Sequence, residues 1–122
     1  MNEKKKTLVL GASENPSRYS YLALLRLQSH QQPVVAIGKK KGVVGNIAIE
    51  TEKKEWNDVD TVTLYLNPVN QKEYYNYILA LKPKRIIFNP GAENDELAEL
   101  ARQQNIQPIE ACTLVLLATN QY

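Results

Sequence analysis

The sequence has few of the residues that build cross-linked or metal-bound proteins. Cys112 is the one cysteine and His30 the one histidine among 122 residues. An intramolecular disulfide is therefore excluded, and so is a zinc site with several cysteine ligands. The lack of a disulfide framework is typical of proteins in a reducing cytoplasm, where we expect this chain to reside.

Long apolar runs and an excess of one charge are also missing. The first apolar run spans only residues 7–10, whereas a membrane span needs about 20 apolar residues and a signal peptide needs a longer apolar region than this one. We therefore expect no membrane partner. Fifteen basic and 13 acidic side chains leave a net charge of +2, and nucleic-acid binding usually needs a strongly basic face. We expect no nucleic-acid partner either.

Short apolar runs and amphipathic stretches alternate along the chain. A hydrophobic content of 43% and the length of one ordinary domain predict a single domain over residues 1–122. Continuous apolar runs that end in Gly, Asn or Pro predict strands buried on both faces. These runs cover residues 7–10, 33–37, 61–65, 85–88 and 107–109. Helical periodicity covers residues 19–29, 70–81 and 93–104, and residues 112–118 suit a short closing helix.

This order predicts an α/β fold of the Rossmann-like, doubly wound type. We expect a mostly parallel, five-stranded sheet with helices on both faces and right-handed crossovers. Residues 38–60 form an irregular segment in this prediction, with a small strand near residues 46–49. In such a sheet, ligands bind outside the carboxyl ends of the strands, where the strand order reverses.

The first loop at that edge has features that suit a pyrophosphate. Gly11 allows a tight turn and a close approach to a ligand. Ser13 and Asn15 offer short polar side chains, and Arg18 offers a cation near the N-terminus of the first helix. The full glycine fingerprint of dinucleotide-binding proteins is absent. The alternative is a plain strand-to-helix turn in which Ser or Asn caps the helix.

The second loop is basic where an NAD-binding protein has a carboxylate. It reads Gly38-Lys39-Lys40-Lys41-Gly42, and cations there favour a ribose that carries an extra phosphate. Coenzyme A has a 3′-phosphate and NADP a 2′-phosphate, so both remain candidates. Lys39 is nearest to the strand end, and we predict that it contacts the phosphate. A solvated run of surface charges is the alternative.

The two later loops contribute Asn67 and the pair Asn89-Pro90, which are candidates for lining the rest of the cleft. Helix capping is the stronger interpretation of Asn67, because Pro68 follows it. We name no catalytic residue and no metal ligand. His30 falls near the end of the first helix, away from the cleft, and Cys112 is interpreted as a small buried residue.

These segments, in this order, resemble the small stand-alone CoA-binding domain proteins, which are similar to the CoA-binding domain of the succinyl-CoA synthetase alpha subunit. The likeness runs from about Lys6 to the end of the sequence. Its matching pieces are Val9-Leu10-Gly11-Ala12-Ser13-x-Asn15-Pro16, the strand and basic loop of residues 34–39, Asn89-Pro90-Gly91-Ala92-Glu93-Asn94 and Glu110-Ala111-Cys112-Thr113.

The resemblance implies a Rossmann-type domain that holds CoA at the first turn and at the end of the second strand. Carried over residue by residue, it points to Gly11, Ala12, Ser13, Asn15, Pro16, Arg18 and Lys39. Proteins that look like this generally have no established enzymatic activity. The sequence lacks the synthetase's phosphohistidine segment, so we expect no synthetase reaction. Where relatives often have Asn-Pro before the lysine, this chain has Ile37-Gly38.

Our prediction is a module that binds coenzyme A or an acyl-CoA without evident catalysis, and a homodimer is compatible with it. One alternative is an NADP-type dinucleotide-binding or oxidoreductase-like domain. Another is an interaction domain that has lost its ligand. The predicted cofactor-binding residues are Gly11, Ala12, Ser13, Asn15, Pro16, Arg18, Gly38, Lys39, Asn67, Asn89 and Pro90.

Overall fold

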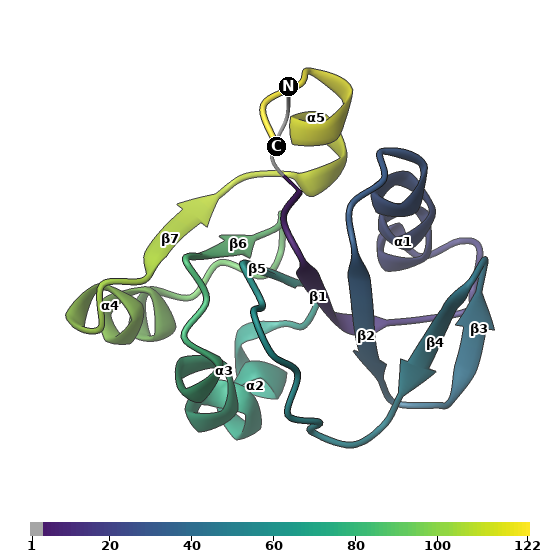
Figure 1. Ribbon diagram of the computed structural model, residues 1–122. Coiled ribbons are helices and arrows are strands. Elements are labelled where there is room, and N and C mark those ends of the chain that lie inside the picture. Colours follow the sequence, from purple (N-terminus) through teal and green to yellow (C-terminus); the bar gives the residue numbers. More distant parts are fainter. Residues whose placement is uncertain (1–3) are drawn as a thin grey trace.

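A computed structural model describes residues 4–122, in which strands and helices alternate except for the consecutive strands β2 to β5 (Figure 1). The strands are β1 (Thr7–Ala12), β2 (Val34–Gly38), β3 (Gly42–Val44), β4 (Ile47–Glu50), β5 (Thr61–Leu64), β6 (Arg85–Phe88) and β7 (Gln107–Glu110). The α-helices are α1 (Tyr19–Ser29), α2 (Pro68–Gln71), α3 (Tyr75–Leu81), α4 (Asp95–Gln103) and α5 (Thr113–Ala118). A 3₁₀ turn, η1 (Lys72–Tyr74), joins α2 to α3.

The strands form one sheet in the order β3-β4-β2-β1-β5-β6-β7. Every neighbouring pair is parallel except β3 and β4, which form an antiparallel hairpin at one edge. The chain runs from β1 to β2 on one side and later returns to place β5 on the other side of β1. The strand order therefore reverses at β1, and the ends of β1, β2 and β5 mark the edge where such folds bind ligands.

The structure confirms the α/β, Rossmann-like architecture and the five predicted strands, but the sheet has seven strands, not five. The two additional strands, β3 and β4, lie in the segment that we predicted to be mostly irregular. Strand β4 confirms the small strand predicted near residues 46–49, whereas β3 was missed, and with three residues it is too short to give a clear alternating pattern. Pairing with β2 through Ala36 and Ile37 extends the sheet over this segment.

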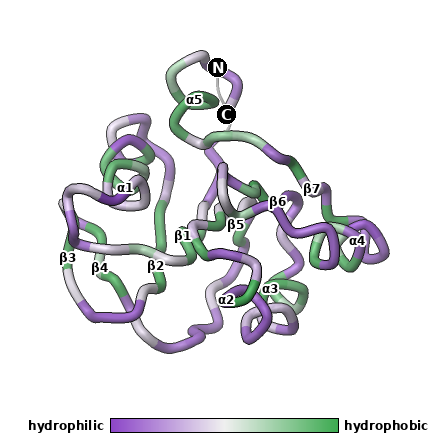
Figure 2. The backbone as a smooth tube through the Cα atoms, turned by 180° about the vertical axis from the view of Figure 1, so that it is seen from behind, coloured by the Kyte–Doolittle hydropathy of each residue, from purple (hydrophilic) through white to green (hydrophobic). Residues whose placement is uncertain are grey.

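Two apolar cores fill the spaces between the sheet and its helices. Leu24 and Leu27 of α1 pack on one face together with Leu117 of α5, and Ile78 of α3 and Leu97 of α4 pack on the other. Figure 1 shows α1 and α5 beside each other and well separated from α4. In Figure 2 the hydrophobic segments concentrate in the strands and in helix faces turned inward. Burial on both faces explains why the central strands read as continuous apolar runs.

Local capping fixes where the helices begin and end. Asn67 accepts a hydrogen bond from the Asn70 backbone N–H, and Pro68 occupies the first position of α2, as we predicted. Asn94 caps α4 in the same way. Asn105 has φ 61 and is the left-handed residue that follows α4.

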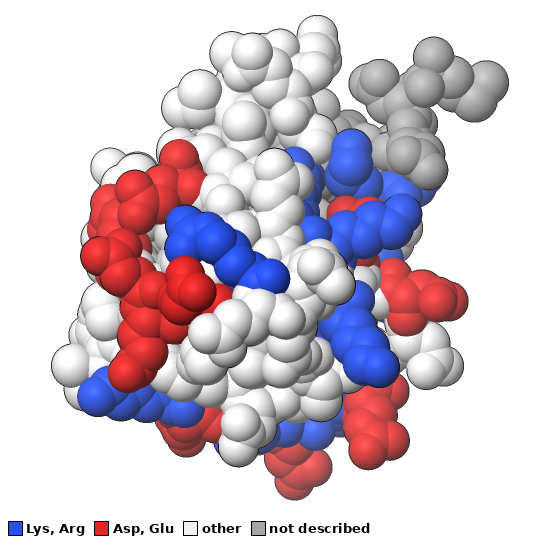
Figure 3. Space-filling model, turned by 90° about the vertical axis from the view of Figure 1, so that its left-hand side faces the viewer, with Lys and Arg blue, Asp and Glu red and all other residues white. Residues whose placement is uncertain are grey.

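No helix of the described part of the chain is long and apolar enough to cross a membrane. Figure 3 shows one face of the molecule, on which acidic side chains gather on the left, whereas basic and acidic side chains are mixed on the right. Neither sign covers that whole face.

Candidate functional site

The first and second loops leave the sheet side by side. Ala12 ends β1 and pairs with Gly38, which ends β2. A Cβ on Gly38 would lie 2.2 Å from the Ala12 carbonyl oxygen, so only glycine permits this approach of the two backbones. Lys39 follows directly. The glycine turn and the basic loop are therefore neighbours at the carboxyl edge of the sheet, as the sequence predicted.

The conformation of Gly11 is explained by a close approach within the protein. Its φ is +96, and a Cβ there would lie 2.9 Å from both the carbonyl carbon and the carbonyl oxygen of Tyr65. Tyr65 continues the pairing of β5 with β1, because its N–H donates to the Leu10 carbonyl oxygen over 2.9 Å. Packing of two neighbouring strands thus accounts for Gly11 before any ligand is considered.

Short polar side chains organise the first loop from within. Ser13 Oγ accepts a hydrogen bond from the Asn15 N–H. Asn15 Oδ1 accepts from the N–H and the hydroxyl of Ser17, at 3.0 and 2.8 Å. These contacts form the Asx-type turn that Asn and Ser favour. Pro16, which lies inside this turn, is exposed.

The N-terminus of α1 opens toward solvent at the same edge. Arg18 is its N-cap residue, with an extended backbone and no side-chain cap hydrogen bond. The Arg18 side chain is exposed. The helix is 11 residues long, so its first N–H groups and its dipole present partial positive charge at this edge.

Within residues 4–122, the lysines of the second loop form no ion pair. Lys39, Lys40 and Lys41 are all exposed. Ion pairs within residues 4–122 are Lys54–Glu50, Lys84–Asp60 and Arg102–Glu99, so none uses a lysine of this loop.

The second loop itself lacks a carboxylate, but the first loop brings one to it. Glu14 Oε2 accepts a hydrogen bond from the Val43 N–H over 2.8 Å. Sequence reasoning missed this contact, because the two residues are 29 positions apart and no spacing rule relates them.

The two later loops are tied to the protein interior rather than to the open edge. Asn89 is 2% exposed. Its Nδ2 donates to Thr63 Oγ1 and to the Leu64 carbonyl, at 2.7 and 2.9 Å, and its Oδ1 accepts from the Thr113 N–H at 2.9 Å. This side chain joins β5, β6 and α5. Pro90, next to it, is exposed. The ligand contacts predicted for Asn67, Asn89 and Pro90 stay predictions.

A second buried amide connects the same two loops. Gln71 is fully buried, and its Nε2 donates to the carbonyl oxygens of Leu66 and Ala92, each over 2.8 Å. Its Oε1 accepts from Asn94 Nδ2. The loop after β5 and the loop after β6 are therefore held as one unit. The helical pattern predicted a single helix over residues 70–81, whereas the structure has α2, η1 and α3 there. The pattern gave no sign that Gln71 is buried.

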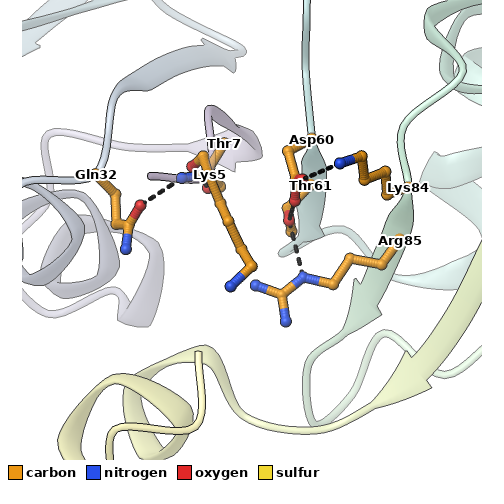
Figure 4. Close-up of polar contacts among 7 residues, drawn as sticks. All are labelled: Lys5, Thr7, Gln32, Asp60, Thr61, Lys84 and Arg85. Atoms are coloured by element: carbon orange, nitrogen blue, oxygen red, sulfur yellow. Dashed lines mark hydrogen bonds and ion pairs between the residues drawn. The ribbon is translucent and has the colours of Figure 1, made fainter. Parts of the chain in front are cut away.

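Two hollows lie at the opposite edge of the sheet. One is lined mainly by Lys4, Lys6, Asp60, Lys82 and Lys84, and the other by residues 29–32, 117 and 120–122 with Lys4 and Lys5. Figure 4 shows polar contacts at this edge, including Lys84 with Asp60 and Arg85 with Thr61. Neither hollow borders a predicted site residue. The carboxyl edge remains the better candidate, because the strand order reverses there.

Comparison with known proteins shows which family the chain belongs to. The model of a family described as a CoA binding domain matches residues 5–118. A crystal structure titled only as an uncharacterized protein is 51% identical, with TM-score 0.96, and the match covers 99% of this chain and 100% of that one. No protein with a curated description matches the chain.

More distant structures share the fold. A hypothetical protein from Pyrococcus horikoshii OT3 is 21% identical, with TM-score 0.82, over 92% of this chain and 80% of that one. A protein from Thermus thermophilus is 18% identical, with TM-score 0.82, over 98% of this chain and 91% of that one. At this identity the likeness concerns architecture alone.

Proposed function

Because the chain belongs to the family of CoA-binding domains, we propose that it binds coenzyme A or an acyl-CoA at the carboxyl edge of its sheet. The cofactor lies between the glycine turn after β1 and the basic loop after β2. The proposal rests mainly on one observation, the pairing of Ala12 with Gly38. This pair brings a helix N-terminus and three exposed lysines to the same edge.

The first loop supplies the pyrophosphate end of this site. The N-terminus of α1 has no side-chain cap, so its N–H groups and dipole are available to an anion. Arg18 adds an exposed guanidinium suited to phosphate oxygens. Ser13 and Asn15 keep the loop in its turn and leave their remaining hydrogen-bonding capacity for the ligand.

The second loop supplies the part of the proposed site that distinguishes one nucleotide from another. Lys39 is the first residue beyond β2 and is exposed. In the proposed complex its ammonium group pairs with the 3′-phosphate of CoA, and Lys40 and Lys41 add to the local positive potential. The residues fit an anionic adenosine group, because no ion pair of the described chain neutralises these lysines.

The proposed activity is binding alone. His30, the one histidine, is the C-cap residue of α1, and so lies at the opposite end of that helix from the glycine turn. We assign no general acid, general base or nucleophile to the site.

Thermal unfolding with four ligands tests the proposal. At a ligand concentration of 100 times the dissociation constant, CoA stabilises the protein by about 2.7 kcal/mol. Dephospho-CoA, which lacks the 3′-phosphate, gives a much smaller shift. A shift with NADP but not with CoA would reverse the choice of cofactor, and no shift with CoA, dephospho-CoA, NADP or NAD would favour a domain without a nucleotide ligand.

A further inference from the structure

One carboxylate crosses between the two loops of the proposed site. Glu14 lies in the first loop, and its Oε2 accepts a hydrogen bond from the Val43 N–H of β3 over 2.8 Å. Strand β3 is at the edge of the sheet, so one side of its backbone has no partner strand. Glu14 satisfies a donor that would otherwise face solvent.

Gly42 makes room for this contact. A Cβ on Gly42 would lie 2.2 Å from Glu14 Cδ and 2.5 Å from Glu14 Cγ. Unlike Gly11 and Gly91, Gly42 does not have a positive φ. Its backbone therefore does not demand glycine, but a Cβ there would displace the Glu14 side chain from its present position.

The basic loop is consequently held at both of its ends. Gly38 is fixed at the base by its pairing with Ala12, and Val43, which pairs with Ala48 of β4 on one side, is bonded to Glu14 on the other. Only the stretch 39–42, with its three lysines, lies between these attachments. Both attachments come from the same short segment, residues 12–14, so the lysines are held beside the glycine turn.

The carboxylate fixes the loop without neutralising it. Glu14 is bonded to a backbone amide, and the ion pairs found within residues 4–122 join other residues. Each lysine of the loop is thus outside these ion pairs and is available to a ligand. A loop that is ordered beforehand loses less conformational entropy when an anion binds, which strengthens binding.

We infer that Glu14 is a positioning residue. Its hydrogen bond to the Val43 N–H, called the clasp below, holds Lys39–Lys41 in place for the phosphate of the ligand. The role of the clasp in affinity rests on the proposed function, whereas the clasp itself is a property of the ligand-free protein. Glu14 touches no reacting atom in this account and acts only through the loop.

Three variants separate the clasp from a general effect of charge. Glu14→Ala removes the acceptor, Glu14→Gln keeps an acceptor oxygen but removes the charge, and Glu55→Ala removes a charge from an exposed residue in the segment between β4 and β5. Amide hydrogen exchange of residues 39–43 is measured by NMR without ligand. Calorimetry then gives the affinities for CoA and dephospho-CoA.

Glu14→Ala is expected to accelerate exchange at Val43 and in the loop, and to weaken CoA binding about tenfold, the factor that corresponds to 1.4 kcal/mol. Dephospho-CoA binding changes less, so the ratio of the two affinities falls. Glu14→Gln restores both the protection and the ratio, and Glu55→Ala leaves both as in the wild type. Gly42→Ala, which displaces an intact Glu14, reproduces Glu14→Ala.

Two results overturn the inference: unchanged exchange at Val43 in Glu14→Ala, or faster exchange with an unchanged ratio of affinities. A wild-type protein that does not bind CoA contradicts the proposed function instead. In that case the exchange data alone decide on the clasp, since faster exchange in Glu14→Ala and Gly42→Ala supports it and unchanged exchange refutes it.

Discussion

Gly11 lies so close to the backbone of Tyr65 that a Cβ on Gly11 would be 2.9 Å from the Tyr65 carbonyl oxygen. This contact joins β1 to the segment that follows β5, and it lies at the point where the strand order reverses. The glycine turn that marks the proposed cofactor site is therefore also a packing requirement of the sheet.

Gly11→Ala should destabilise the protein more than Gly91→Ala. The two glycines have similar φ angles, +96 and +92, so the left-handed backbone costs alanine about 1–2 kcal/mol at either position. A Cβ at Gly91 would meet no atom within 4 Å, whereas one at Gly11 meets backbone. Overpacking of that kind adds about 1–3 kcal/mol.

Urea unfolding of both variants measures the difference. The entropy that alanine removes from the unfolded chain is the same in each and cancels. Equal losses of stability would contradict the interpretation that Gly11 is required by its contact with Tyr65.

Asn89→Ala should cost about 3 kcal/mol of unfolding free energy, because it removes the Asn89 partner of the Leu64 carbonyl and of the Thr113 N–H, and one of the two hydrogen bonds of Thr63 Oγ1. Asn89→Asp should be at least as harmful, since a buried carboxylate cannot donate to the Leu64 carbonyl. Asn67→Ala is the matched control. Asn67 is exposed and caps α2, so its loss should cost only about 1 kcal/mol. If Asn89→Ala cost no more than Asn67→Ala, the buried hydrogen bonds of Asn89 would contribute little to stability.

The sequence predicted the elements whose causes are local. Apolar runs located the five strands that form most of the sheet, and Asn67 and Pro68 marked the start of a helix correctly. Each of these signals lies within a few residues of the feature it sets. The loop positions followed, because the carboxyl ends of parallel strands share one edge.

Contacts between distant segments could not be predicted in this way. Strand β3 has three residues and depends on its pairing with β4. Gln71 carries a polar side chain in a helical pattern, and only the fold shows that it is buried between two loops. Glu14 lies inside a loop that we had singled out, yet its partner is 29 residues away.

Lys39→Ala should abolish most of the preference for CoA over dephospho-CoA. The lost phosphate contact should weaken CoA binding by about 10-fold to 100-fold, as expected for a charge-assisted hydrogen bond worth about 1.5–3 kcal/mol. Dephospho-CoA binding should hardly change. Calorimetry at two salt concentrations tests whether the loss of CoA affinity comes from a charge contact, because added salt screens contacts between exposed charges.

Lys53→Ala provides the control for Lys39→Ala. Lys53 is exposed, but its ammonium group donates to the Glu73 carbonyl and lies 5.1 Å from the centre of the Tyr74 ring. Its removal should leave both affinities unchanged. If Lys39→Ala kept full discrimination, another residue would have to bind the 3′-phosphate.

Tyr65→Phe should stabilise the protein, by about 1 kcal/mol at neutral pH. The Tyr65 hydroxyl is buried without a hydrogen-bond partner among residues 4–122. The nearby hydroxyls of Thr63 and Thr113 already bond to each other over 2.8 Å. Burial, together with the neighbouring Cys112, raises the pKa of Tyr65. Removing the hydroxyl relieves its desolvation and creates no unpaired partner.

The gain should grow in alkali, because of the sign of this pKa shift. A raised pKa means that the folded protein keeps the neutral phenol after the unfolded chain has begun to ionise. Stability is therefore intact below the ordinary tyrosine pKa of about 10 and falls as the pH rises above it, by up to about 1.4 kcal/mol per pH unit. Tyr65→Phe lacks this contribution, so its advantage over the wild type widens above about pH 10. Urea unfolding at several pH values, with Tyr19→Phe as a control at a tyrosine that is 75% exposed, measures the widening. A constant difference between Tyr65→Phe and the wild type would mean that Tyr65 ionises as readily in the folded protein as in the unfolded chain.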